Sequence, residues 1–155
     1  MKKLIITLFI IGAFQFSEAQ MYEYQVVTSV ESIVPSGLGR SRLIAGTAKR
    51  DFKDFTSKRT SENDQRNKSK RSKIRVKDFE ETKMLNFFNI GGIRFQNIAS
   101  NDAIVTSKMN SLSAEGWELA FVTSGVESYS GDKDNSGIFV TRYIFKRKVQ
   151  KDKEE

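Results

Sequence analysis

The segment 37–42, with the sequence GLGRSR, holds the residues best suited to chemistry in this chain. Gly37 and Gly39 free backbone N–H groups to approach an anion. Arg40 and Arg42 can grip a carboxylate or phosphate in bidentate fashion. The segment lacks the glycine spacing of dinucleotide-binding loops and the Lys-Ser/Thr pair of a phosphate loop. It predicts a small anion site, and the alternative is a plain loop with both arginines on the outward face of the following strand.

Two missing residue types narrow the remaining chemistry, because the 155 residues include no His and no Cys. Ser-His-Asp triads, thiol nucleophiles and zinc sites built from His or Cys are therefore excluded. Catalysis by carboxylates, by a Ser/Lys pair or by Tyr remains possible, but no two such residues have the spacing of a catalytic pair. Glu115 and Glu118 flank a helix end, where both are expected to point to solvent. We predict that the protein is not an enzyme and uses no metal or cofactor. The alternative is an unrecognised carboxylate-dependent hydrolase.

An acidic loop at 132–137, with the sequence DKDNSG, resembles the first half of a calcium-binding EF-hand loop. Oxygen ligands stand at its first, third and fifth places, with Gly at the sixth. The twelfth place is Tyr143 instead of the bidentate Glu, and a strand pattern follows instead of a helix. The loop is therefore interpreted as a hairpin tip.

Most of the positive charge lies in one segment, residues 49–77, where twelve Lys/Arg stand against four Asp/Glu. The net charge of the whole chain is +7, so the high isoelectric point belongs to this segment and not to the fold. Within 46–72 only Phe52 and Phe55 interrupt the polar run, which is too little apolar surface to offset the entropy of ordering. A mobile basic insertion is predicted over 46–72.

The partner of this basic segment depends on where the protein works. Lys/Arg clusters bind phosphates by releasing counterions, but no interleaved aromatic residues or nucleic-acid motif accompany residues 49–77. Nucleic acid is therefore not the expected partner. An anionic component of the cell envelope, such as lipopolysaccharide or an acidic polysaccharide, is the expected one. The alternative is a solvated loop with no partner.

Alternation of apolar and polar residues predicts the strands that position these segments. The clearest are 22–30 and 138–146; further strands are expected at 40–45, 117–122 and, as the return strand of a long hairpin paired with 40–45, at 73–77. The segment 78–95 is harder to interpret. Asp78 and Glu81 fit a capping box for a short helix or turn, and an extended segment is expected after it, from Ile93 to Ile98.

The main helix is predicted to begin at Ser100 or Asn101 as its N-cap and to end at Gly116 in the left-handed conformation. Its apolar positions are Val105, Met109 and Leu112, with Ile104 and Lys108 beside them, and Trp117 is expected in the core beside the helix end. We expect Trp117, Leu119 and Phe121 to share one face of the next strand.

The last strand is apolar on both of its faces. Phe139, Tyr143 and Phe145 alternate with Ile138, Val140 and Ile144. One helix can cover only one side of a sheet, so either the middle segment or another chain must cover the second side, and a homo-oligomer is the expected form in the latter case. The fold class predicted is α+β: a β-α-β-β core with a small antiparallel or mixed sheet, one main helix on one face, and an inserted long basic hairpin or loop.

Three segments resemble a family of small bacterial domains that has no established activity. They are Tyr-Glu-Tyr-x-Val-Val at 22–27, Asn-x-Leu-x-x-x-Gly-Trp-Glu-Leu at 110–119, and the aromatic strand end with Lys-Arg at 143–147. The segments 37–42 and 95–102 look like marks of an exported, Bacteroidetes-type subgroup. The resemblance covers about half of residues 20–155 and leaves 46–72 outside. It implies a β-α-β-β core and nothing about catalysis.

The first nineteen residues are predicted to be a bacterial secretory signal. Lys2 and Lys3 precede an apolar run at 4–14, and Ser17 and Ala19 occupy the small-residue places of a cleavage site. The run is shorter than the ~20 apolar residues that span a membrane; the alternatives are a membrane anchor or a buried strand. Export to the periplasm or beyond is expected, with a single domain at 20–148, a charged tail at 149–155 and no transmembrane segment in the mature chain. Without Cys this domain has neither disulfides nor a lipidated cysteine, so packing alone must stabilise it.

Overall fold

The computed structural model describes residues 21–32, 41–89, 91–127 and 138–149. The described residues fall into two compact units, residues 24–147 and residues 21–23 with 148–149. In the smaller unit the N–H of Val149 donates to the carbonyl oxygen of Met21 at 3.0 Å. The main helix and nearly all of the sheet belong to the larger unit.

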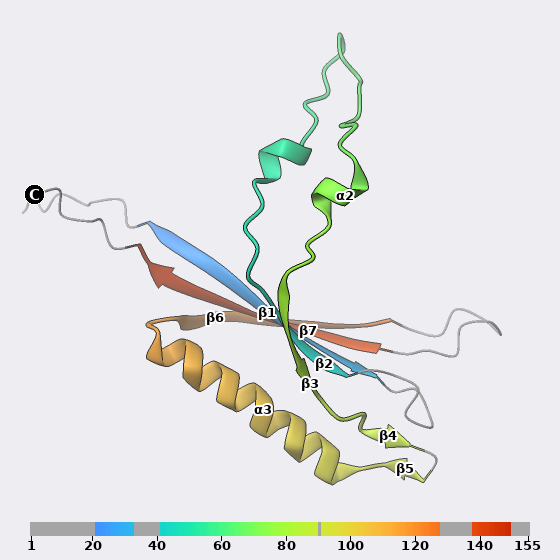
Figure 1. The fold of residues 1–155 in the computed structure, drawn as a ribbon, viewed down its shortest axis with the longest axis vertical. Helices are drawn as coiled ribbons and strands as arrows, with labels where there is room; N and C mark the ends of the chain where they lie inside the picture. Colours follow the sequence, from blue (N-terminus) through green and yellow to red (C-terminus); the bar gives the residue numbers. More distant parts are fainter. Residues whose placement is uncertain (1–20, 33–40, 90, 128–137, 150–155) are drawn as a thin grey trace, which may run out of the picture. The chain divides into compact units, whose positions relative to one another are not determined.

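A five-stranded antiparallel sheet and one long helix make the protein an α+β fold, as predicted (Figure 1). The strand order across the sheet is β3-β2-β1-β7-β6, which places the first strand at the centre. The bounds are β1 Tyr22–Ser32, β2 Arg42–Gly46, β3 Phe79–Lys83, β6 Glu118–Glu127 and β7 Ile138–Lys148. The helix is α3, Phe95–Ala114, preceded by a separate two-stranded hairpin of β4, Phe88–Asn89, and β5, Gly92–Ile93.

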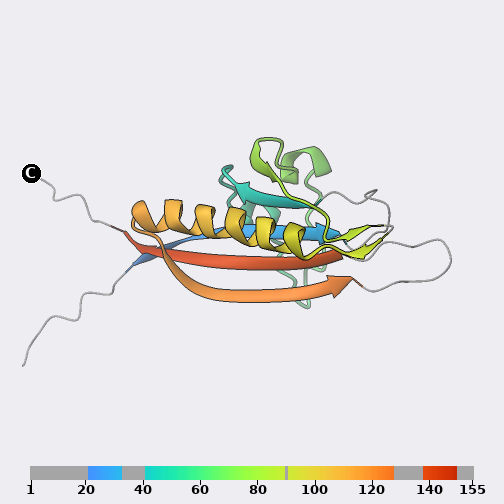
Figure 2. The ribbon, with the colours of Figure 1, turned by 90° about the horizontal axis from the view of Figure 1, so that it is seen from below.

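The core lies between α3 and one face of the sheet, which we call the helix face (Figures 1 and 2). Directly paired residues share a face, so Val27 and Ala45 lie on the helix face, as do Ser29 and Leu43. The buried apolar residues are Val27, Leu43, Ala45, Met84, Leu112 and Phe145, and Ile104, Val105, Met109, Trp117 and Tyr143 pack against them. The predicted apolar positions of the helix are thereby confirmed.

The helix ends at Gly116, as predicted. Gly116 has a φ of 83°, and the N–H groups of Glu115 and Trp117 both donate to the carbonyl oxygen of Leu112, at 3.1 and 3.0 Å. This geometry satisfies carbonyl groups that a helix end otherwise leaves without partners.

Gly116→Ala is expected to lower the free energy of unfolding by about 1 kcal/mol, because a side chain disfavours positive φ. Space is not the cause, since a Cβ at this position would meet only Arg147 Cδ at 3.6 Å. Urea unfolding followed by circular dichroism measures the change. The control is Gly125→Ala, where φ is not positive and no atom lies within 4 Å of the new Cβ; equal losses in the two variants would contradict this account.

The start of the helix differs from the prediction. The helix begins at Phe95 with Arg94 as its N-cap, and Arg94 makes no capping hydrogen bond through its side chain. Asn101 is not a cap but a buried residue within the helix. Its amide is engaged by the backbone of another segment, so its polarity does not mark the helix terminus. The extended segment expected from Ile93 to Ile98 is confirmed only at Ile93, which lies in β5, and is wrong beyond it because the helix already begins at Phe95.

The segment from 73 to 83 is also shifted from its predicted place. The return strand is β3, Phe79–Lys83, which pairs with β2 from Arg42 opposite Lys83 to Gly46 opposite Phe79. The predicted strand at 73–77 is wrong, and Arg71–Ile74 forms the short helix α2 instead. The capping box of Asp78 and Glu81 is wrong too, because pairing with β2 decides the conformation there.

A bulge in β6 changes which side chains share a face. Leu119 pairs with Phe145 whereas Phe121 pairs with Ile144, so the register shifts at the residue between them. An extra residue in one strand moves the following side chains to the other side of the sheet. The prediction that Leu119 and Phe121 lie together is therefore wrong, and Phe121 lies on the face opposite the helix. The alternation predicted for β7 is confirmed, since Phe139, Tyr143 and Phe145 face one way and Val140 and Ile144 the other.

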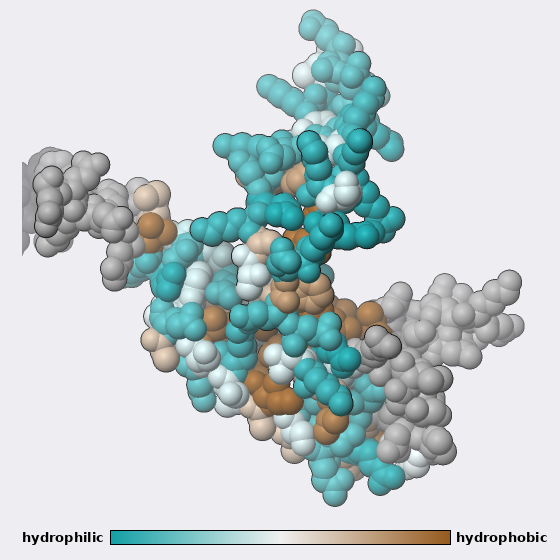
Figure 3. All heavy atoms as spheres, viewed as in Figure 1, coloured by the Kyte–Doolittle hydropathy of each residue, from teal (hydrophilic) through white to brown (hydrophobic). Residues whose placement is uncertain are grey.

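The insertion joins β2 to β3 and projects away from the sheet (Figure 1). It contains the 3-10 turn η2, Phe52–Phe55, and the helix α2. Figure 3 shows this projection as largely hydrophilic. The structure describes the whole of 46–72, and its mobility stays a prediction.

Candidate functional site

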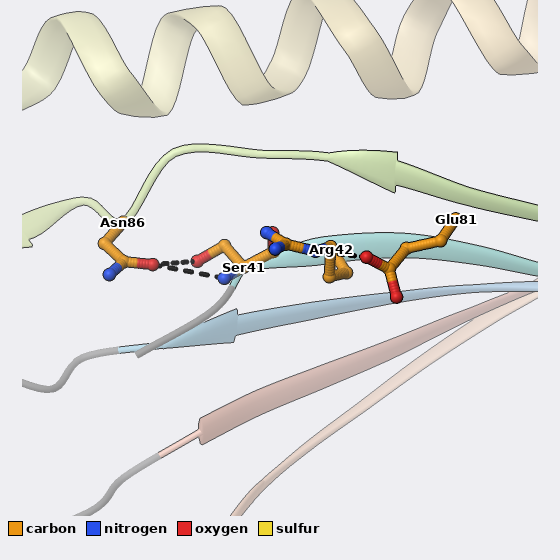
Figure 4. A network of polar contacts seen from close by, with 4 residues as sticks. All are labelled: Ser41, Arg42, Glu81 and Asn86. Atoms are coloured by element: carbon orange, nitrogen blue, oxygen red, sulfur yellow. Dashed lines mark hydrogen bonds and ion pairs between the residues drawn. The ribbon is translucent and has the colours of Figure 1, made fainter. Parts of the chain in front are cut away.

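Arg42 is the one residue of the predicted anion site that lies within the described residues; Gly37, Gly39 and Arg40 lie outside them. Its Nε is 2.6 Å from Glu81 Oε1, and its Nη1 donates to the carbonyl oxygen of Ser41 at 2.7 Å (Figure 4). The guanidinium therefore already binds a carboxylate that the neighbouring strand β3 supplies. An anion site at 37–42 stays a prediction.

Ser41, next to this arginine, is fully buried. Its hydroxyl and its backbone N–H both donate to Asn86 Oδ1, at 2.7 and 3.1 Å (Figure 4). An amide oxygen is too weak a base to activate a serine as a nucleophile. Ser41 therefore fastens the start of β2 to the loop after β3.

Asn101 makes a second polar connection, from the middle of α3. Its Oδ1 accepts from the N–H of Leu85 at 2.9 Å, and its Nδ2 donates to the carbonyl oxygen of Leu85 at 2.8 Å and to Glu31 Oε1 at 3.0 Å. One turn earlier, Asn97 Nδ2 donates to the carbonyl oxygen of Asn86 at 2.6 Å. We call Asn86, Asn97 and Asn101 the asparagine clamp, because together they join α3, β1, β2 and the loop after β3.

The asparagine clamp was not predicted from the sequence. It connects the segments 37–42 and 95–102, since Ser41 lies in the first and Asn97 and Asn101 lie in the second. All its hydrogen bonds are internal, and no buried side-chain N or O atom among the described residues is left without a partner. Its role is to hold the fold together.

Groups for catalysis or metal binding do not gather in the described part of the chain. No cluster of three or more acidic residues there is arranged to hold a metal ion. Glu115 and Glu118 are exposed, as predicted, and Glu118 Oε2 lies 3.7 Å from Lys146 Nζ. The acidic loop 132–137 lies outside the described residues.

Two shallow grooves flank α3. One, of about 510 Å³, runs along β2 and β3 and includes Lys108; the other, of about 460 Å³, runs along β6 and includes Trp117 and Glu118. Lys108 Nζ is 2.8 Å from Glu80 Oε2, and the Arg147 guanidinium stacks 4.4 Å from the centre of the Trp117 ring. The charged groups of both grooves are thus paired within the protein, and neither groove presents convergent free groups to a ligand.

The strongest candidate for a functional surface is the sheet face opposite α3. We call it the open face and define it by six side chains: Tyr24, Val26, Ile44, Phe121, Val140 and Ile144. Tyr24 is 65% exposed, Phe121 61% and Val26 42%, and the other three are half-buried. The insertion projects on this same side of the sheet, from its β2–β3 part (Figure 1), but it leaves the rings of Tyr24 and Phe121 exposed. The prediction that one side of the sheet lacks a cover from the helix is confirmed.

The second candidate surface is the insertion itself. Among the described residues, only one of the twelve cations at 49–77 forms an ion pair, Arg59 with Asp64 at 2.8 Å. Arg50 is bonded to backbone carbonyl oxygens instead, those of Lys49 and Arg75. The positive charge of residues 49–77 is therefore largely uncompensated within the chain.

Comparisons with known protein families, with curated proteins and with solved structures gave no match. No helix in the described ranges has the length and apolarity needed to cross a membrane. The function is therefore inferred from the open face and the insertion, and not from a relative.

Proposed function

We propose that this protein is an exported, non-enzymatic domain that associates with a second copy of itself through the open face. The observation that carries this proposal is the row of exposed apolar side chains on the side of the sheet that α3 does not cover. Burial of apolar surface is the main driving force of protein association. Contiguous exposed apolar patches commonly mark interaction sites.

The proposal takes β1, α3, β6 and β7 as the β-α-β-β core, with β2 and β3 as the base of the inserted basic hairpin. Export rests on the sequence of residues 1–19, which lie outside the described residues. The alternative function, binding of a small anion at 37–42, has less support because Arg42 is already paired with Glu81.

The size of the open face suits a dimer. Neighbouring strands lie ~4.8 Å apart and each residue rises ~3.3 Å, so three long and two short strands offer about 600 Å² per face. Two such faces bury about 1,200 Å² in total, which is the lower end of the range for specific interfaces. Face-to-face packing of twisted sheets at ~10 Å separation is a common way to bury such surfaces.

Ion pairs lie toward both edges of the open face, and Arg142, which faces the same way as Val140 and Ile144 on β7, is one charge nearer its centre. Arg42 pairs with Glu81 toward the β3 edge, and Lys146 lies near Glu118 toward the β6 edge. Specific interfaces commonly have an apolar centre with a polar, solvated rim. A two-fold dimer uses the same patch on both copies, so each apolar centre would meet the other.

Val26→Lys tests the proposal because Val26 lies on the central strand β1. The residue is 42% exposed, so the variant is expected to fold with an unchanged circular dichroism spectrum. Placing a charge at the centre of the interface is expected to weaken association at least ~100-fold, which corresponds to about 2.7 kcal/mol. Light scattering after size exclusion, over a series of concentrations, measures the mass of each protein.

Phe95→Lys is the matched control, since Phe95 is 77% exposed at the start of α3 and is not part of the open face. It is expected to dimerise like the wild type. A wild-type protein with the mass of one chain at every concentration would overturn the proposal. So would a Val26→Lys variant that dimerises as tightly as the wild type, which would point to pairing through the edge strand β6 instead.

A further inference from the structure

We propose that the insertion docks onto an anionic lipid surface, and we call residues 49–77 the basic arm. Figure 1 shows the basic arm projecting from the β2–β3 part of the sheet on the side away from α3, and none of the six side chains that define the open face belongs to it. The inference rests on residues of the basic arm alone. Charge, shape and exposed apolar side chains each support it.

The first support is the uncompensated charge. Twelve cations and four acids lie in 29 consecutive positions, and of these twelve cations Arg59 alone is ion-paired within the described structure. Side chains such as Lys68, Lys70 and Lys73 are exposed and have neither an ion pair nor a hydrogen bond in the described structure. Basic segments of this density are attracted to the negative potential of an anionic bilayer within about a Debye length, ~8 Å at physiological salt.

The second support is that the two limbs of the basic arm are joined. Arg50 Nη2 donates to the carbonyl oxygen of Arg75 at 3.3 Å, and Asn67 Nδ2 donates to that of Asp54 at 3.0 Å. Ser69 Oγ donates to the same Asp54 oxygen at 3.3 Å. These bonds hold the cations of the two limbs next to one another, which reduces the ordering entropy that binding must overcome.

The turns of the basic arm are also held locally by short polar side chains. Asp51 Oδ1 accepts from the N–H of Lys53 at 2.9 Å, Asn63 Oδ1 from Gln65 at 3.1 Å, and Asn67 Oδ1 from Ser69 at 2.8 Å. Such side chain–backbone bonds replace a core in a segment that has none. The acid Asp51 is thereby used in a turn and does not neutralise a cation.

The third support is a pair of exposed apolar side chains among the cations. Phe52 on η2 is 70% exposed and Ile74 on α2 is 49% exposed. They lie at a similar level of the basic arm, because Arg50 bonds to Arg75 and Asp54 bonds to Asn67 on either side of them. Large apolar residues surrounded by Lys and Arg are typical of segments that lie at a lipid–water interface.

The exposed side chains of Phe52 and Ile74 also favour lipid over nucleic acid as the binding partner of the basic arm. Binding of single strands uses successive aromatic rings on which bases stack, and Ile74 offers no ring. Apolar groups instead gain free energy by entering the boundary between headgroups and acyl chains. The ligand chemistry that fits the basic arm is therefore a surface of lipid phosphates, with the two apolar side chains inserted between headgroups.

Vesicle flotation tests the inference, with phosphatidylcholine vesicles that either contain or lack phosphatidylglycerol. All proteins are purified as full chains from the same native cells, so that residues 1–20 are processed alike in each. The wild type is expected to float with the anionic vesicles, and to be released as salt rises from about 0.1 M to about 1 M and the Debye length falls from ~10 to ~3 Å.

Lys68→Gln/Lys70→Gln/Lys73→Gln is expected to weaken binding to anionic vesicles about 100-fold, at roughly five-fold for each cation lost. Lys83→Gln/Arg94→Gln/Lys148→Gln removes the same charge from exposed positions outside the basic arm and is expected to change binding only a few-fold. Equal losses in the two variants would mean that net charge, and not the basic arm, binds lipid, and would overturn the inference.

Phe52→Ser/Ile74→Ser separates lipid from nucleic acid. It is expected to weaken vesicle binding about ten-fold and to leave unchanged any binding to a DNA duplex. If the wild type binds duplex DNA more tightly than anionic vesicles at the same salt, and this variant binds vesicles as the wild type does, the partner is nucleic acid and the inference is wrong.

Discussion

Asn101→Leu is expected to lower the free energy of unfolding by about 2–4 kcal/mol. The residue is 1% exposed, and its amide makes three hydrogen bonds, two of them to the N–H and the carbonyl oxygen of Leu85. Leucine has the same number and branching of side-chain heavy atoms but no polar atoms. It would leave both backbone groups of Leu85 facing an apolar side chain, and each buried polar group without a partner costs about 1–3 kcal/mol.

The measurement is urea unfolding at equilibrium, with circular dichroism as the probe. Asn110→Leu is the matched control, because Asn110 lies on the same helix and is exposed; it is expected to change stability by no more than about 0.5 kcal/mol. If Asn101→Leu unfolded at the same urea concentration as Asn110→Leu, the asparagine clamp would have no part in stability.

The end of α3 and the strand β7 could be predicted from the sequence because their signals are local. Glycine is the residue type that takes positive φ at little cost. Gly116 follows a run of apolar residues at helical spacing, which marks it as the end of the helix. In β7 apolar side chains point to both faces, and no bulge interrupts their alternation along the strand. These two elements imply a sheet with apolar residues on both faces, which is why an uncovered side could be predicted.

The start of α3 and the position of β3 could not be predicted, because distant residues determine both. Glu80 and Glu81 give β3 the composition of a helix turn, yet Glu81 binds Arg42 and Glu80 binds Lys108. An edge strand tolerates such charges, since they also protect it from pairing with other chains. The buried role of Asn101 could not be predicted either, because its hydrogen-bond partners are 16 and 70 residues away in the sequence.

The open face was predicted only in part, because the bulge in β6 cannot be seen in the sequence. The pattern of Trp117, Leu119 and Phe121 is that of a regular strand, and the register shift moves Phe121 away from the other two. This shift adds a ring that is 61% exposed to the side without a helix. A structural irregularity thus enlarges the candidate interface, and it adds the ring close to the β6 edge.

The two proposed surfaces differ in what they require of the core. The side chains of the open face have to be fixed, because packing of two sheets depends on side chains held in register. The basic arm needs only its two joined limbs, since attraction between charges depends weakly on detailed geometry. A loss of core packing is therefore expected to affect dimerisation before it affects lipid binding.

Leu112→Ala is the second large loss that we expect, about 3 kcal/mol in the free energy of unfolding. Leu112 is 2% exposed and belongs to the core beside Val27, Leu43 and Phe145. Truncating a buried leucine removes the transfer free energy of its methyl groups and leaves a cavity, for a total of about 2–5 kcal/mol. The backbone carbonyl of Leu112 keeps its bonds to Glu115 and Trp117, so the helix end is expected to persist.

Leu119→Ala is the matched control for this loss, because the same atoms are removed from a side chain that is 37% exposed. It is expected to cost about 1 kcal/mol or less, since little apolar surface returns to water and no enclosed cavity forms. Equilibrium unfolding in urea separates the two variants by their midpoints. Equal midpoints would mean that the contact between α3 and the helix face does not dominate stability. The chain has no disulfides, and this contact is the main apolar core of the described residues, so the stability of the fold is expected to depend on it.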